Sequence, residues 1–127
     1  MIGDMFDVFF FDLDGVIYIG GETTPGAVSV LDALRSMGKT IRFLTNNPTT
    51  RVRIADRLRG HGVAAEMDEI VTSGSATAKY LAGEGIGRAW VIGESGLHKE
   101  VELAGILPAG ETDCEAVVVV WEDAATL

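Results

Sequence analysis

Short apolar runs alternate along the chain with longer segments in which apolar residues recur every three or four positions. The short runs predict buried strands at residues 7–11, 40–44, 69–72, 88–92 and 116–121. The longer segments predict helices that begin at residues 25, 49, 75 and 95 or 96, and that end at residues 37, 59, 81 and 103. Strands that alternate with helices are typical of an α/β fold with a parallel sheet.

The predicted ends of these elements depend on capping and turn residues. Thr24 and Pro25 suit the N-cap and the first position of the first helix, and Gly38 suits its end. Ser73 is the expected cap of the helix over residues 75–81. Residues 15–24 contain three glycines and therefore predict a loop.

Composition and charge limit the class of protein. The chain has 127 residues, of which 47% are hydrophobic and 23% charged, as in an ordinary globular domain. Its formal net charge of −9 argues against a nucleic-acid partner and against a membrane-binding basic patch. Cys114 is the single cysteine, which excludes an internal disulfide. Because the sequence has neither an apolar run of about 20 residues nor a signal-peptide pattern, we expect a cytoplasmic protein.

Two carboxylates follow the first predicted strand. Asp12 and Asp14 stand two residues apart, and Gly15 after them allows a sharp turn. In open α/β sheets, ligands bind outside the carboxyl ends of the strands. Two carboxylates so close together repel each other unless a cation or a proton lies between them, and Mg²⁺ prefers oxygen ligands. One carboxylate can then attack phosphorus while the other transfers protons. The alternative interpretation is that Asp12, Asp14 and Gly15 form an ordinary turn at the end of a strand.

A second polar cluster follows the second predicted strand. Thr45, Asn46 and Asn47 stand there, directly before a predicted helix. Their hydroxyl and amide groups can bind an anion, helped by the free backbone N–H groups of a helix start. The alternative is that Asn46, Asn47 or Thr49 caps the helix, and both interpretations can hold for different residues.

The motifs together resemble the haloacid dehalogenase superfamily of phosphohydrolases, and more narrowly its branch of sugar phosphatases, nitrophenyl phosphatases and phosphoglycolate phosphatases. The resemblance rests on four stretches in the order and approximate spacing of that branch, FFFDLDGVIYIGGETTPGA, FLTNN, VTSGSATAKYL and WVIGESGLHKEVELAGI. It covers nearly the whole chain. It implies a Rossmann-like parallel sheet core of the superfamily's type, followed by the beginning of an inserted α/β cap domain.

The resemblance also implies a role for each matching residue. Asp12 would be the nucleophile and a Mg²⁺ ligand. Asp14 would be the general acid and base, and its backbone carbonyl would also bind the metal. Thr45 and Asn46 would hold the phosphoryl group, together with backbone N–H groups near Asp14 and Gly15. The implied substrate is a small phosphorylated metabolite.

The resemblance further implies groups that do not occur at matching positions in these 127 residues. The superfamily's third-motif lysine and fourth-motif acidic pair follow the cap domain. We therefore expect an N-terminal portion, with part of the core at residues 1–84 and the start of a truncated cap at residues 85–127. The exposed sheet edges of such a portion favour association into a homo-oligomer.

Three alternative functions stay open. A compact phosphatase without a cap would use Lys99 as the cation that binds phosphate, and Glu122 with Asp123 as metal ligands. A truncated or degenerate member would instead be a non-catalytic binding or assembly module. Phosphoryl transfer to an acceptor other than water also stays open. His61 lies between two glycines after a helix, and we interpret it as a loop residue rather than a catalytic one.

Overall fold

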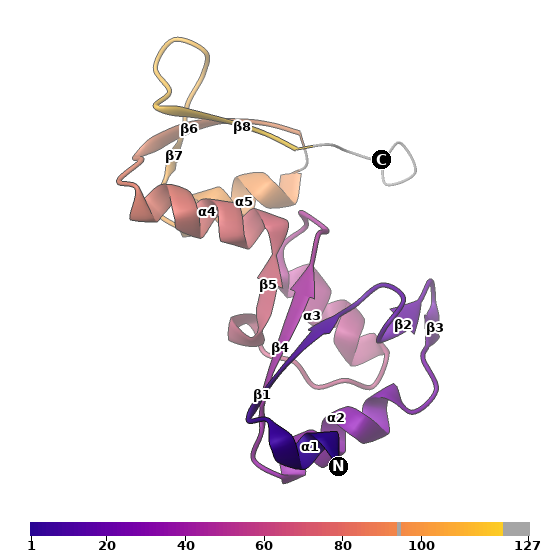
Figure 1. The fold of residues 1–127 in the computed structure, drawn as a ribbon. Coiled ribbons are helices and arrows are strands. Elements are labelled where there is room, and N and C mark those ends of the chain that lie inside the picture. The colour runs from indigo at the N-terminus through magenta and orange to yellow at the C-terminus, as the bar shows by residue number, and fades with distance from the viewer. Residues whose placement is uncertain (94, 121–127) are drawn as a thin grey trace. The chain divides into compact units, whose positions relative to one another are not determined.

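The computed structural model describes residues 1–93 and 95–120 of the chain (Figure 1). The chain forms two compact units. The first consists of Met1–Thr45 and Arg51–Val71, and the second consists of Asn46–Thr50 and the residues from Thr72 onward. Each unit contains strands paired in parallel, which confirms the predicted α/β class. Within the described part of the chain, no helix is both long enough and apolar enough to span a membrane.

The first unit contains a three-stranded sheet in the order β1-β4-β5. Strands β1 (Val8–Asp12) and β4 (Thr40–Thr45) run parallel, and helix α2 (Ala27–Ser36) connects them. The register of this pair places Asp12 opposite Leu44. The other elements of this part of the chain are α1 (Ile2–Met5), β2 (Tyr18–Ile19), β3 (Glu22–Thr23), α3 (Arg51–Gly60), the 3₁₀ helix η1 (Met67–Glu69) and β5 (Ile70–Thr72).

One face of this sheet forms the core of the first unit. Ile41 and Phe43 on β4 are buried, while Leu44 between Phe43 and Thr45 is exposed, as the alternation of a strand requires. The Phe43 ring is fully buried, and its centroid lies 6.4 Å from that of Phe11. The helices and loops contribute the rest of this core, including Leu13, Ile17, Leu31, Leu34, Ile54, Leu58 and Val63.

The segment between β1 and α2 differs from its prediction. Residues 15–24 were expected to be a loop, but Tyr18 pairs with Thr23 in an antiparallel hairpin of the two-residue strands β2 and β3. The expected helix start at Thr24 and Pro25 is also wrong, because the N-cap is Gly26. Gly26 has φ +83°, a left-handed conformation that interrupts the helix before Ala27 and that favours glycine.

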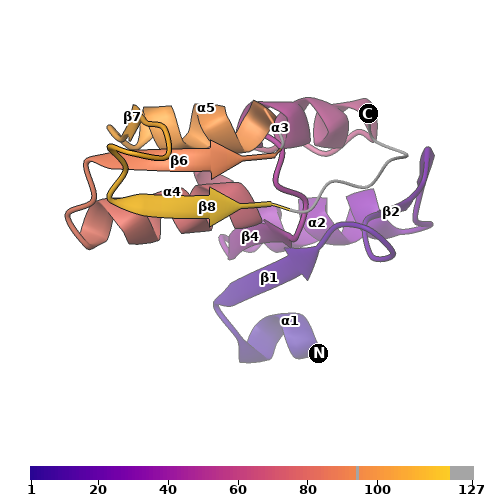
Figure 2. The same ribbon diagram turned by 90° about the horizontal axis from the view of Figure 1, so that it is seen from above.

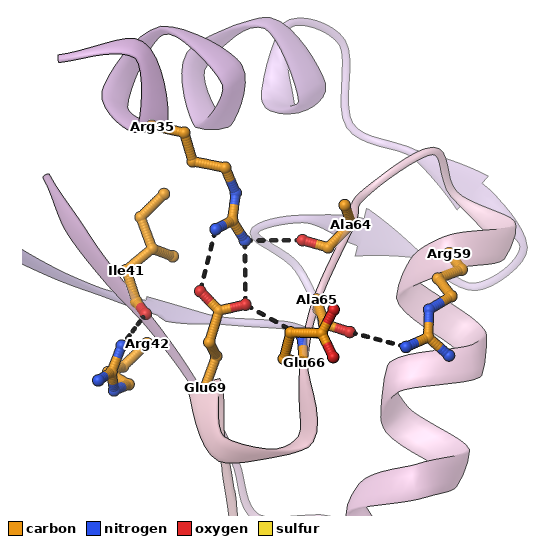
Figure 3. Close-up of polar contacts among 8 residues, drawn as sticks. All are labelled: Arg35, Ile41, Arg42, Arg59, Ala64, Ala65, Glu66 and Glu69. Atoms are coloured by element: carbon orange, nitrogen blue, oxygen red, sulfur yellow. Dashed lines mark hydrogen bonds and ion pairs between the residues drawn. The ribbon is translucent and has the colours of Figure 1, made fainter. Parts of the chain in front are cut away.

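A network of polar contacts joins α2 to the segment that leads into β5 (Figure 3). The guanidinium of Arg35 donates to both carboxylate oxygens of Glu69, at 3.0 and 3.3 Å, and to the Ala64 carbonyl at 2.6 Å. Glu69 also accepts the backbone N–H of Glu66 at 3.0 Å. Burial raises the pKa of Glu69, but these hydrogen bonds and the charges of Arg35 and Arg42 outweigh burial and hold the pKa below its usual value.

This lowered pKa predicts a pH-dependent contribution to stability. A carboxylate with a depressed folded-state pKa stabilises the fold above its unfolded pKa, and the stabilisation is lost as pH falls through the folded pKa. Glu69→Gln is therefore expected to lower the free energy of unfolding by about 1–2 kcal/mol at pH 7, and by much less below about pH 4. Urea denaturation at both pH values measures this difference. Glu22→Gln, at an exposed position of β3, is the control, and an equal loss at both positions would contradict the prediction.

The second unit is a three-stranded sheet in the order β7-β6-β8 with two helices on one face (Figures 1 and 2). Its central strand β6 (Arg88–Ile92) has the predicted bounds, and it pairs in parallel with β7 (Leu107–Pro108) and β8 (Ala116–Val119). Strand β7 was not predicted. The helices are α4 (Ser73–Gly83) and α5 (Ser95–Leu103). Their buried side chains pack on the sheet in a core that includes Ala78, Leu81, Ala89, Val91, Leu97, Val101 and Ile106.

The N-terminus of α4 is capped by a residue other than the one expected. Thr72, rather than Ser73, is the N-cap. The Thr72 hydroxyl accepts the backbone N–H of Ser75 at 2.9 Å, and the Ser75 hydroxyl accepts the backbone N–H of Thr72 at 2.9 Å. This reciprocal pair satisfies two backbone donors of the helix start.

The boundary between the two units lies at residues 71 and 72, with Asn46–Thr50 belonging to the second unit. The sequence predicts a boundary between core and cap at residues 84 and 85. By its contacts α4 belongs to the second unit, and the division of the chain into a core at residues 1–84 and a cap at residues 85–127 stays a prediction.

Candidate active site

Asp12 and Asp14 lie where β1 ends and the chain turns. Both side chains are exposed, whereas Leu13 between them is completely buried in the core of the first unit. Burial of Leu13 fixes the backbone here and leaves the two carboxylates on the surface. The Asp12 carboxylate accepts the backbone N–H of Leu13 at 2.8 Å, which restrains its orientation. The strand end therefore presents two carboxylates on a backbone anchored by an apolar side chain.

The turn after these carboxylates is closed by backbone hydrogen bonds. Gly15 has φ +83°, and its N–H donates to the Tyr18 carbonyl at 2.8 Å. The Leu13 carbonyl accepts from Ile17 at 2.9 Å. A Cβ placed on Gly15 would meet no atom within 4 Å in the described part of the chain beyond its two neighbours, so the positive φ, and not the available space, favours glycine here. Its N–H is used inside the turn, and its expected contact with a phosphoryl group stays a prediction.

Thr45 ends β4, the parallel neighbour of β1. Because Asp12 lies opposite Leu44, Thr45 follows one residue beyond the partner of Asp12 at the same end of the sheet. Its side chain is buried on the core-facing side of β4. The structure thus places Asp12, Asp14 and Thr45 at the carboxyl ends of two adjacent strands, where α/β folds bind ligands.

Asn46 follows Thr45 directly and belongs by its contacts to the second unit. Its side chain is exposed, and its contact with a phosphoryl group stays a prediction. The Asn47 side chain accepts the backbone N–H of Thr49 at 3.0 Å, a local turn that precedes the start of α3 at Arg51. This bond lies before the helix, so the capping interpretation for Asn46, Asn47 or Thr49 stays a prediction.

A cluster beside the hairpin was not foreseen from the sequence. The His61 ring stacks on Tyr18 with centroids 4.7 Å apart, and its Nδ1 lies 2.7 Å from the Thr23 hydroxyl oxygen. His61 thereby links the end of α3 to both strands of the hairpin. Its position in a loop between two glycines was recognised, but no local signal indicated partners that lie 38 and more residues away.

Tyr18 connects this cluster electrostatically to the two carboxylates. Its side chain is 2% exposed, and within residues 1–93 and 95–120 its hydroxyl makes no hydrogen bond of good geometry, although Arg57 lies near it. Burial raises the pKa of Tyr18; the nearby Arg57 lowers it in part, while the negative charges of Asp14 and Asp12 raise it further. The phenol is therefore kept neutral beside the strand end that carries the carboxylates.

The donor set at this strand end is compatible with Mg²⁺. Asp12 and Asp14 supply hard carboxylate oxygens of the kind that Mg²⁺ prefers, and magnesium is commonly held by one or two carboxylates with water and substrate oxygens. Within residues 1–93 and 95–120, no group of three or more His, Cys, Asp and Glu side chains is arranged to hold a metal. That Asp12 and Asp14 hold the ion stays a prediction.

The residues of the compact-phosphatase alternative are only partly described. Lys99 is exposed on α5 in the second unit. Glu122 and Asp123 lie outside the described residues. That alternative gains no support from the structure and stays a prediction.

Comparison with known proteins defines the class. Residues 9–107 match the model of the haloacid dehalogenase-like hydrolases, and the chain belongs to this family. Over 115 residues it is 37% identical to the 4-nitrophenylphosphatase of Schizosaccharomyces pombe, covering 87% of this chain and 39% of that protein. Over 102 residues it is 39% identical to a sugar-phosphatase of Bacillus subtilis, covering 79% of this chain and 38% of that protein. The predicted family and branch are thereby confirmed.

A solved structure of the family has the same fold. The crystal structure of a glycerol phosphate phosphatase from Mycobacterium tuberculosis, in complex with magnesium, is similar with a TM-score of 0.85 and 30% identity. The similarity covers 97% of this chain and 38% of that one. The chain thus spans less than half the length of the relatives that it matches.

Proposed function

We propose that the protein takes part in the Mg²⁺-dependent hydrolysis of a small phosphomonoester, such as a sugar phosphate, phosphoglycolate or a nucleotide-like ester, through an aspartyl-phosphate on Asp12. The observation that carries this proposal is the register of β1 and β4. It puts the Asp12 carboxylate and Thr45 at the same end of two neighbouring parallel strands, with Asp14 two residues further on. Membership of a hydrolase family whose relatives are named phosphatases supports the same chemistry.

The proposed reaction has two displacements at phosphorus. In the first, an Asp12 carboxylate oxygen attacks, the bond to the ester oxygen breaks, and Asp14 gives its proton to the leaving alcohol. In the second, Asp14 takes a proton from water, which attacks the aspartyl-phosphate, releases inorganic phosphate and restores Asp12. Thr45 and Asn46 bind phosphoryl oxygens throughout. Bound Mg²⁺ would neutralise the charge on the phosphoryl oxygens and on the two carboxylates.

Hydrolysis of 4-nitrophenyl phosphate by a complete chain, in which these residues are joined to the implied lysine and acidic pair, tests this proposal. We expect release of 4-nitrophenol in excess Mg²⁺, loss of the activity on chelation with EDTA, and its return when Mg²⁺ is restored. The physical reason is that two neighbouring carboxylates repel each other and an anionic substrate unless a cation offsets their charge. Equal rates with and without Mg²⁺ would contradict the proposed metal dependence.

A non-catalytic binding module is the second candidate. It is compatible with the two exposed carboxylates at the end of β1, which can bind a cation without any turnover. Its signature would be a rise in the melting temperature with phosphate and Mg²⁺ in the absence of any turnover.

A further inference from the structure

The loop between β4 and α3, residues 46–50, contacts the N-terminus of α4 within the second unit. The Ser73 hydroxyl donates to the Asn46 backbone carbonyl at 2.8 Å. Gly74 is buried directly under the next part of the loop, where a Cβ placed on it would lie 2.9 Å from the Pro48 carbonyl oxygen. These contacts place Asn46–Thr50 in the second unit, although Thr45 belongs to the first.

The Ser73 hydroxyl is not needed to cap its own helix. Thr72 and Ser75 already satisfy each other's backbone N–H groups at the start of α4. The Ser73 carbonyl accepts the Thr77 hydroxyl at 2.8 Å within the same helix, which leaves the Ser73 hydroxyl as the group that reaches the loop. Its bond to Asn46 is therefore a contact between the helix and the loop, and not a by-product of helix capping.

Gly74 allows a close approach that no other residue would permit. A Cβ 2.9 Å from a backbone carbonyl oxygen cannot be relieved by rotating a flexible side chain, so either the loop or the helix would have to move. The same Cβ on Gly74 would lie 3.4 Å from Leu97 Cδ1, so this second neighbour limits how far the helix start can shift away from Pro48. Gly74 is the second residue of α4, and glycine is less favourable than alanine within a helix, so the close contact with Pro48 explains its presence here.

We propose that Ser73 and Gly74 are positioning residues, which hold the backbone of the 46–50 loop and thereby restrict the conformation of Asn46, whose contact with a phosphoryl group belongs to the proposed function. This inference rests on the proposed function for the role of Asn46. The hold on the loop itself rests on the two contacts alone. The residues act through the backbone of the loop and do not themselves touch the substrate.

The test uses two pairs of variants in the full chain. Ser73→Ala removes the hydroxyl that bonds to Asn46, whereas Ser73→Thr keeps a hydroxyl at this position. Gly74→Ala introduces the Cβ next to Pro48, whereas Gly83→Ala at the other end of the same helix meets no atom within 4 Å. Helix propensity alone predicts that both alanines raise the melting temperature. We expect Gly83→Ala to raise it or leave it unchanged, and Gly74→Ala to lower it.

Two further readouts separate a positioning role from a merely structural one. Hydrogen exchange at the Thr49 amide, which is bonded to Asn47 inside the loop, is expected to become about tenfold faster in Ser73→Ala and Gly74→Ala. Calorimetric titration with inorganic phosphate in Mg²⁺ is expected to show weaker binding in the same two variants, with dissociation constants about fivefold or more larger than in the parent chain. Ser73→Thr and Gly83→Ala should match the parent chain in both measurements.

Each outcome decides the proposal. Unchanged exchange at Thr49 in both variants would overturn the hold on the loop. Faster exchange with unchanged phosphate affinity would overturn the positioning role and leave a structural contact. A parent chain that binds no phosphate in Mg²⁺ would overturn the proposed function and the role of Asn46 with it, while the exchange data would still show whether Ser73 and Gly74 hold the loop.

Discussion

In a complete chain, which also supplies the implied third-motif lysine and fourth-motif acidic pair, Asp12→Asn is expected to slow the hydrolysis of 4-nitrophenyl phosphate about 10³-fold or more, because the variant lacks the attacking carboxylate. The substitution keeps the size of the side chain, and the asparagine carbonyl oxygen can still accept the Leu13 N–H that Asp12 accepts at 2.8 Å. Asp12 is exposed, so the fold should be preserved. Steady-state release of 4-nitrophenol in excess Mg²⁺ gives the ratio of rates.

The matched control for this prediction is Asp32→Asn. Asp32 is an exposed residue of α2, on the same unit but remote in sequence from the carboxyl ends of the strands. The Asp32→Asn substitution removes the same charge as Asp12→Asn. It should leave the rate of hydrolysis within about twofold of the parental rate, since single exposed charges act weakly through water. Hydrolysis that persisted at the parental rate in Asp12→Asn would show that Asp12 is not the nucleophile.

Phe43→Ala is expected to produce the largest loss of stability, about 3–5 kcal/mol, because it removes a fully buried ring from the core of the first unit. The ring lies between the sheet and its covering helices and faces Phe11 at 6.4 Å between centroids. Denaturation in urea, followed by circular dichroism, measures the change. Should the alanine variant fail to fold, Phe43→Leu, which keeps most of the apolar volume, is expected to fold with a smaller loss.

Phe10→Ala is the control for this substitution. Phe10 is 63% exposed on β1, the strand that pairs with β4, whereas Phe43 is 0% exposed. Loss of an exposed aromatic ring from a strand should cost less than about 1 kcal/mol. An equal loss at both positions would contradict the assignment of Phe43 to the core and Phe10 to the surface.

Much of the fold was predictable because apolar periodicity reports burial. Residues 88–92 were expected as a strand and coincide with β6, whose alternate residues Ala89 and Val91 face the helices. The hairpin of β2 and β3 was not predicted, because strands of two residues are too short to show an alternation of apolar and polar residues. The start of α2 was misplaced because Pro25 favours a first helical position, while the positive φ of Gly26 was not visible in the sequence.

The candidate site was predictable as far as it follows from strand ends. Parallel strands that are neighbours in the sheet bring their carboxyl ends together, so Asp12, Asp14 and Thr45 could be expected at one edge. The stacking of His61 on Tyr18 could not, because it depends on where the end of α3 meets the hairpin. The bond from Ser73 to Asn46 likewise joins residues 27 positions apart, and no local pattern encodes it.

The parallel pairing of β1 with β4 has a consequence for folding. The pair joins Val8 to Thr40 and Asp12 to Leu44, so every contact closes a stretch of chain that includes the whole of α2. Such non-local contacts form more slowly than turns or helices because the entropy of closing the intervening chain is lost first. Asp12 and Thr45 therefore become neighbours only when this closure is complete. The return of phosphate binding during refolding would time that event, and the site's own ligand would serve as a probe of the step that assembles the sheet.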